Sequence, residues 1–146
     1  MNSNIFKGMD IRGVVGTDLT VATAWDIGKA LADWLPTAGS VVISKYGTAN
    51  QQLVNAIIEG LRLQGRSVVD LGEGDKIVLT EAIIHEGYSG GVLVSHDTMA
   101  DEVTIELYRE EGKLIDSESG LGDIAVLVEA GNFVPAAVKG NLATTA

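Results

Sequence analysis

The sequence contains no cysteine among its 146 residues, which excludes disulfide bonds and thiolate metal sites. Basic residues are scarce: 10 Lys and Arg stand against 20 Asp and Glu, so the formal net charge is −10. Such a field repels nucleic acids and anionic membranes, and we expect neither as a partner. The sequence has no uncharged apolar run as long as a membrane span, and no apolar signal segment follows Met1. We therefore expect a cytoplasmic protein.

Apolar and charged residues occur in the proportions of an ordinary folded domain, at 46% and 21%. A chain of 146 residues is long enough for one hydrophobic core. The sequence shows neither an internal repeat nor a domain linker. We expect one domain over residues 1–131. A flexible C-terminal tail is expected over residues 132–146, where the hydrophobic pattern is weak.

Helical and strand patterns alternate along the chain. Apolar residues recur at helical spacing in residues 21–35, 51–64, 76–85 and 120–130. Short apolar runs that are typical of buried strands occupy residues 40–44, 67–71 and 91–95. Residues 103–109 alternate between apolar and polar, which favours an antiparallel edge strand. This order predicts an α/β fold, a three-layer α/β/α single domain with a mixed, mostly parallel sheet.

Three of the predicted strands lead into polar loops, at residues 44–47, 72–74 and 95–97. Because ligands bind at the carboxyl ends of strands in open α/β sheets, we expect these loops to share one functional edge. The residues gathered there would be Arg12, Lys45, His96 and Ser95. Two cations, an imidazole and a hydroxyl suit a phosphate or a phosphosugar.

Ser95, His96 and Asp97 are also the residue types of a hydrolytic triad. Consecutive residues that leave a strand point in different directions, and the stretch lacks the Gly-x-Ser-x-Gly elbow, so we reject a triad. His96 with Asp97, Asp101 and Glu102 offers metal-ligand types. A solvated acidic loop is the simpler interpretation of this cluster.

Several motifs together resemble the first domain of the α-D-phosphohexomutases, the phosphoglucomutase/phosphomannomutase family. The entry segment is similar to the family's Phe-Lys-Ala-Tyr-Asp-Ile-Arg-Gly, and it reads Phe6-Lys7-Gly8-Met9-Asp10-Ile11-Arg12-Gly13. The central stretch resembles the catalytic loop Thr-Ala-Ser-His-Asn-Pro, and it reads Gly90-Gly91-Val92-Leu93-Val94-Ser95-His96-Asp97. The resemblance covers residues 5–130.

The resemblance implies an isomerase of carbohydrate metabolism, an intramolecular phosphotransferase that acts on hexose phosphates with Mg²⁺. Ser95 would carry the phosphoryl group, with His96 beside it as the second catalytic residue. Arg12, Lys45 and Asp97 would form the substrate and phosphate contacts. Ser95 would be a metal ligand only when phosphorylated and joined by a second domain, so we expect this chain alone to bind no Mg²⁺.

The sequence departs from the family at catalytic positions. The family's acid/base lysine falls on Ile105, and an aliphatic side chain moves no proton. The acidic stretch at residues 97–102 would repel a phosphoserine. We therefore expect the fold to be kept and the isolated chain to be inactive. The alternative is a degenerate stand-alone binding or regulatory module that contacts a partner protein, a small ligand or a second copy.

Overall fold

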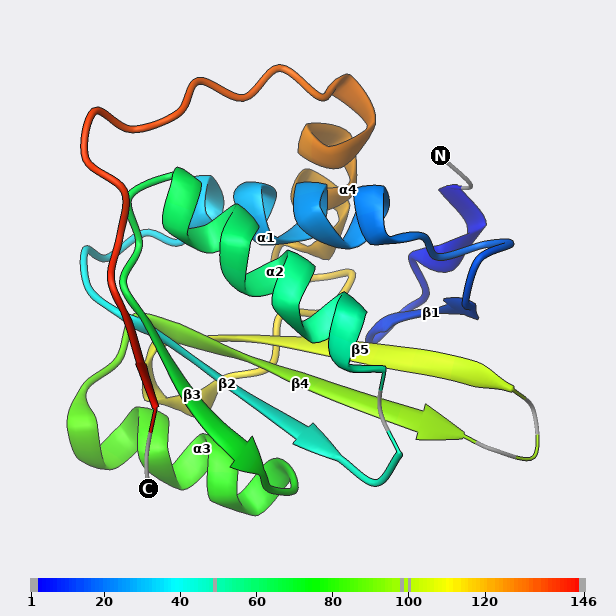
Figure 1. The fold of residues 1–146 in the computed structure, drawn as a ribbon, viewed down its shortest axis with the longest axis horizontal. Helices are drawn as coiled ribbons and strands as arrows, with labels where there is room; N and C mark the ends of the chain where they lie inside the picture. Colours follow the sequence, from blue (N-terminus) through cyan, green and yellow to red (C-terminus); the bar gives the residue numbers. More distant parts are fainter. Residues whose placement is uncertain (1–2, 49, 98, 100, 145–146) are drawn as a thin grey trace.

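One sheet lies between two layers of helices (Figure 1). The structure is a computed structural model that describes residues 3–48, 50–97, 99 and 101–144. The elements follow one another as η1 (Ser3–Ile5), β1 (Ile11–Val14), α1 (Val21–Trp34), β2 (Val41–Tyr46), α2 (Gln51–Leu63), β3 (Val68–Glu73), α3 (Lys76–Glu86), β4 (Gly90–Asp97), β5 (Glu102–Arg109), η2 (Glu110–Gly112), α4 (Leu121–Ala130) and β6 (Leu142–Thr144). Across the described part of the chain, no helix combines the length and apolarity needed to cross a bilayer.

The sheet has six strands in the order β1-β5-β4-β2-β3-β6. Strands β4, β2, β3 and β6 are mutually parallel, and β5 runs antiparallel to both β4 and β1. The predicted mixed and mostly parallel sheet is confirmed. The prediction of an edge strand at residues 103–109 is wrong, because β1 pairs with the outer side of β5 and places Ile11 opposite Ile105.

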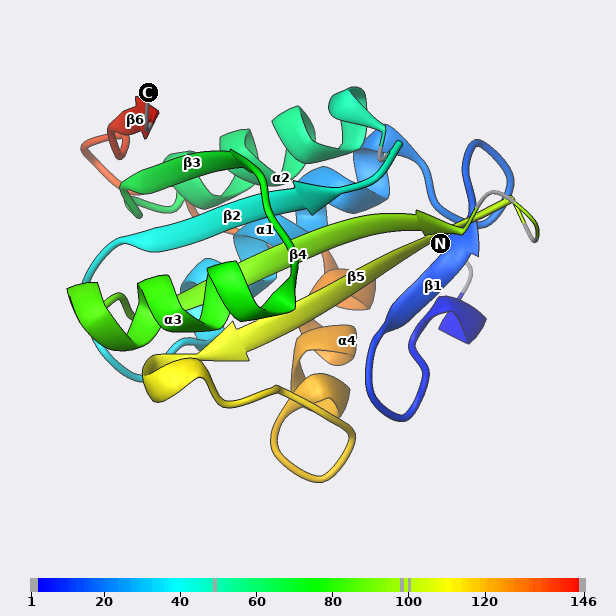
Figure 2. The ribbon, with the colours of Figure 1, turned by 90° about the horizontal axis from the view of Figure 1, so that it is seen from below.

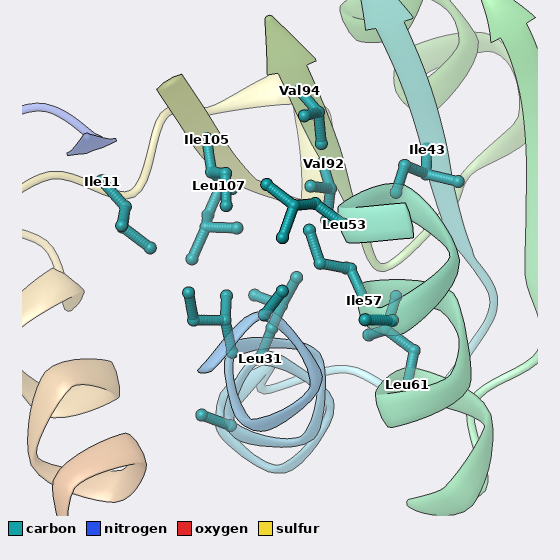
Figure 3. Packing of buried hydrophobic residues seen from close by; sticks show 14 of the residues in the cluster. Ile11, Leu31, Ile43, Leu53, Ile57, Leu61, Val92, Val94, Ile105 and Leu107 are labelled. Atoms are coloured by element: carbon teal, nitrogen blue, oxygen red, sulfur yellow. The ribbon is translucent and has the colours of Figure 1, made fainter. Parts of the chain in front are cut away.

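Helices α1, α2 and α4 cover one face of the sheet, and α3 covers the other (Figures 1 and 2). The larger hydrophobic cluster lies under the three-helix layer, where α2 contributes Leu53, Ile57 and Leu61 (Figure 3). A smaller cluster under α3 contains Leu79 and Ile83. Successive residues of a strand point to opposite faces of the sheet. A strand residue in the larger cluster therefore faces the three-helix layer, and one in the smaller cluster faces α3.

The helix starts follow from capping residues in the sequence. Thr20 accepts a hydrogen bond from the backbone N–H of Thr23 at the start of α1. Asn50 and Asp75 cap α2 and α3 in the same way. Gly87 ends α3 in the left-handed conformation, with a φ of 70°. The four predicted helices are therefore confirmed to within a few residues.

The segment after α4 runs back past the C-terminal end of α2 and ends in β6, which pairs in parallel with β3 (Figure 1). The backbone of Gly140 bonds Arg62 twice, through its N–H and through its carbonyl oxygen. Lys139 Nζ lies 2.7 Å from Glu59 Oε2. The expected domain boundary at residue 131 falls directly after α4, and the flexibility of residues 132–146 stays a prediction.

The ion pair between Lys139 and Glu59 makes the attachment of this segment depend on pH. The hydrogen bond from Lys139 is the largest influence on Glu59 and lowers the pKa of its carboxyl below 4.5. Its contribution is therefore complete above the unfolded pKa and is lost as the pH falls through the folded value. We expect Lys139→Gln to speed amide exchange at Val68, whose N–H donates to Asn141, by about 2- to 5-fold at neutral pH.

Amide hydrogen exchange followed by NMR measures this effect. Lys113→Gln is the matched control, because Lys113 pairs with the exposed Glu111 in a different part of the chain. The difference between Lys139→Gln and the unsubstituted protein should vanish below the folded pKa of Glu59. Equal exchange at Val68 in both proteins at neutral pH would contradict the role given to the ion pair.

Candidate functional site

The carboxyl ends of β2, β3 and β4 lie side by side, as predicted, because β2 pairs in parallel with both neighbours (Figure 2). Two hydrogen bonds tie the loops at this edge together. The backbone N–H of Gly74 donates to the carbonyl oxygen of Lys45 at 2.9 Å, and that of Gly47 donates to Glu73 Oε1 at 2.9 Å. The shared edge is confirmed.

The predicted loop at residues 95–97 is wrong, because β4 continues through Asp97 and stays paired with β5 as far as Glu102. The register places four residues in one line across the sheet, Arg12 on β1, Thr104 on β5, Ser95 on β4 and Tyr46 on β2. Residues directly opposite one another share a face. This line lies on the α3 face, because Leu93, two residues before Ser95, belongs to the cluster under α3.

His96 and Lys45 lie on the opposite face, toward α2. His96 Nδ1 is 3.2 Å from Thr48 Oγ1, and its Nε2 is 3.3 Å from Asp101 Oδ1. Lys45 Nζ donates to Gln51 Oε1 on α2 at 2.7 Å. The predicted site residues therefore share one edge but divide between the two faces of the sheet.

A pocket of about 180 Å³ opens beside His96 on the α2 face. Its lining consists of Val15, Thr48, Asn50, His96, Asp101 and Val103. The pocket does not include Ser95. A group bound in it would meet the imidazole and the Asp101 carboxylate rather than the predicted phosphate carrier.

Carboxylates surround Ser95 on its own face. Asp97 lies two residues along β4 and faces Glu102 across the strand pair, and Glu106 lies on β5 on the other side of Thr104. Glu106 accepts a hydrogen bond from the hydroxyl of Tyr108, and burial raises the pKa of that phenol well above its usual value. A phosphoserine brings about −1.5 to −2 charges at pH 7, so it would be repelled unless a cation compensates.

Arg12 is the cation in the row of Ser95. Its Nε donates to Asp10 Oδ1 at 2.9 Å, and its side chain is 47% exposed. Two strand spacings of about 4.8 Å separate β1 from β4, a span that an arginine side chain can bridge toward a phosphoserine. Asp97, predicted as a substrate contact, accepts a hydrogen bond from the backbone N–H of Met99.

The residues present do not by themselves fit a magnesium ion. Within the described residues, no three His, Asp or Glu side chains come together as a set that could hold a metal. Ser95 and Asp97 share a face, and His96 points to the other one. No catalytic step through Mg²⁺ follows from these side chains.

Ile105 occupies the position where the resemblance puts an acid/base lysine. Its side chain is fully buried in the larger cluster, opposite Ile11 and Val94. A charged side chain would be strongly disfavoured there without a partner. The position therefore serves the hydrophobic core and cannot reach Ser95 on the other face.

The sequence placed Tyr46 in an edge loop but gave it no role, left Thr48 outside the predicted edge, and gave Asp101 no contact. Thr48 and Asp101 contact the two ring nitrogens of His96 from two different loops. Tyr46 follows Lys45 directly, so the alternation of β2 was the signal that could have placed it beside Ser95.

A family model described as Phosphoglucomutase/phosphomannomutase, alpha/beta/alpha domain I matches residues 3–132. The chain is 35% identical to a phosphomannomutase of Salmonella montevideo over 136 residues, which cover 92% of this chain and 30% of that protein. It is 34% identical to a phosphomannomutase of Klebsiella pneumoniae over 132 residues, covering 89% and 83% of the two sequences.

A solved structure of a phosphoglucomutase/phosphomannomutase family protein from Burkholderia thailandensis superposes with a TM-score of 0.79. The superposition covers 99% of this chain and 33% of that one, at 23% identity, and it supports the fold alone. The chain spans about 30% of the length of the first curated relatives it matches.

Proposed function

The chain belongs to the phosphoglucomutase/phosphomannomutase family as its alpha/beta/alpha domain I, and we propose that it is a phosphoserine-bearing domain for phosphoryl transfer on hexose phosphates. The observation that carries the proposal is the position of Ser95. It lies at the carboxyl end of β4, half-buried, in one row with Arg12. A hydroxyl at the carboxyl end of a central strand stands where ligands bind in this class of sheet.

The proposed chemistry is a reversible transfer at Ser95 Oγ. A sugar hydroxyl attacks the phosphorus, a new sugar O–P bond forms, and the serine O–P bond breaks with its electron pair returning to Oγ. The serine oxygen takes a proton, and the sugar hydroxyl loses one. Arg12 supplies positive charge beside the transferred group.

The acid/base lysine that the resemblance implies for this reaction has no counterpart on the face of Ser95. Ile105 is apolar and buried, and His96 faces the other side of the sheet. We therefore propose that the 146-residue chain does not turn over hexose phosphates by itself. The purified chain with Mg²⁺ and glucose 1-phosphate should produce no glucose 6-phosphate, and measurable conversion would overturn this part of the proposal.

A second candidate is a binding or regulatory module that has kept the edge and lost the transfer reaction. The buried Ile105 and the carboxylates around Ser95 favour it. Its ligand would be a hexose phosphate or another small molecule at the same edge, and its partner a mutase or a second copy. A native protein that carries no phosphoryl group on Ser95 but binds glucose 1-phosphate would support the module over the phosphate carrier.

A further inference from the structure

Tyr46 is an exposed aromatic residue that lies beside Ser95. It is the last residue of β2, and 55% of it is exposed. The sheet register pairs it directly with Ser95, one strand spacing of about 4.8 Å away. The two side chains leave the sheet on the same face.

The row has a chemical order along the sheet. It runs from a guanidinium on β1, through the hydroxyls of Thr104 and Ser95, to a phenol ring on β2. Arg12 thus lies on one side of the proposed phosphate carrier and Tyr46 on the other. A molecule that has an anionic end and a ring with apolar faces matches this order.

We propose that Tyr46 contacts the sugar ring of a hexose phosphate, while Arg12 compensates the phosphoryl charge from the other side of Ser95. The inference rests on the proposed function, because it takes its substrate class from that site. The C–H faces of a pyranose ring are apolar, and an aromatic ring offers a large rigid surface for them. Unlike a cation, the phenol adds no charge to the carboxylate-rich face, so it contributes affinity for the ring and not for the phosphate.

Tyr46 is also not needed for packing of the hydrophobic core. Tyr46 is absent from both buried clusters, whereas Tyr108 on the same face is fully buried. Among residues 3–48, 50–97, 99 and 101–144, no side chain or backbone group forms a hydrogen bond with the phenol of Tyr46. Replacing it should therefore leave the fold intact, and binding can be compared between well-folded proteins.

The test is a titration of the ¹⁵N-labelled chain with glucose 1-phosphate and, separately, with inorganic phosphate, followed by amide shifts. Tyr46→Ala should weaken glucose 1-phosphate binding by about 3- to 10-fold and leave phosphate binding unchanged, while Tyr46→Phe should stay within about twofold. Ile84→Ala is the matched control, since Ile84 is 59% exposed on α3 and lies outside the row. Its binding should equal that of the unsubstituted chain.

Three outcomes would overturn the inference. They are an unchanged affinity in Tyr46→Ala, an equal loss for phosphate and glucose 1-phosphate, and no binding of glucose 1-phosphate by the unsubstituted chain. None of these depends on a phosphoryl group at Ser95. A phosphorylated Ser95 in the same preparation would leave the proposed function standing while the role of Tyr46 fails.

Discussion

Replacing Gly60 by alanine is expected to lower the free energy of unfolding by about 2–3 kcal/mol, even though alanine is the better helix former. Helices α1 and α2 touch backbone to backbone at this point. A Cβ atom at Gly60 would press into the carbonyl oxygen of Trp25 and come within 3.0 Å of the backbone nitrogen of Lys29. A Cβ atom at Gly28 on α1 would likewise press into the backbone carbonyl oxygen of Ile57 on α2. An added methyl group would therefore force the two helices apart.

Thermal unfolding measures the effect, and we expect the midpoint to fall by about 4–12 °C for a chain of this size. Gly122→Ala is the matched control, because Gly122 lies in α4 with open space where a Cβ would stand. That substitution should raise stability by about 0.5–1 kcal/mol. A Gly60→Ala protein at least as stable as the unsubstituted one would show that the two helices do not meet as closely as described.

Replacing Arg66 by alanine is expected to cost about 2–4 kcal/mol, because one guanidinium holds several backbone carbonyls. Its nitrogens donate to four carbonyl oxygens around the end of α1 and the following loop, and also to a hydroxyl: Ala32, Leu35, Thr37, Gly39 and Ser89 Oγ, at 2.6 to 3.2 Å. Burial lowers the pKa of this guanidinium, yet arginine stays charged throughout the accessible pH range. The loss should therefore be independent of pH.

Urea unfolding is the measurement for Arg66, with a lower midpoint and an unchanged slope expected for Arg66→Ala. Arg66→Lys should recover only part of the lost stability. The compact ammonium of lysine cannot donate to as many separate carbonyl oxygens as the planar guanidinium does. Arg12→Ala is the control, because the exposed Arg12 forms a surface ion pair with Asp10, and its loss should cost no more than about 0.5 kcal/mol. Equal midpoints for Arg66→Ala and Arg12→Ala would contradict the account.

The local patterns were sufficient to predict the helices and the three central strands. Thr20, Asn50 and Asp75 are caps that act within a few residues, so a sequence read in order can find them. Strand β6 was not predictable in this way. Its three residues are all exposed, and it is held in place by contacts of Gly140 and Lys139 with α2, about 80 positions earlier in the chain.

The sequence was sufficient to predict the sheet edge at which the candidate site lies. It was not sufficient to predict the face of the sheet to which each side chain points. The sequence places Ser95 and His96 next to each other, and the polar run suggests a turn. Because β4 remains paired with β5 through Asp97, alternation sends the two side chains to opposite sides of the sheet. The length of that pairing depends on the register of a strand that arrives later in the chain, so no local pattern around Ser95 could have settled it.

Ser95 is proposed to carry a phosphoryl group, and the intact mass of the native purified protein shows whether it does. We predict a population heavier than the sequence mass by one phosphoryl group. This population should be absent in Ser95→Ala and retained in Thr104→Ala, which removes the neighbouring hydroxyl of the same row. A native protein at the unmodified mass, or a phosphoryl group that persists in Ser95→Ala, would contradict the account.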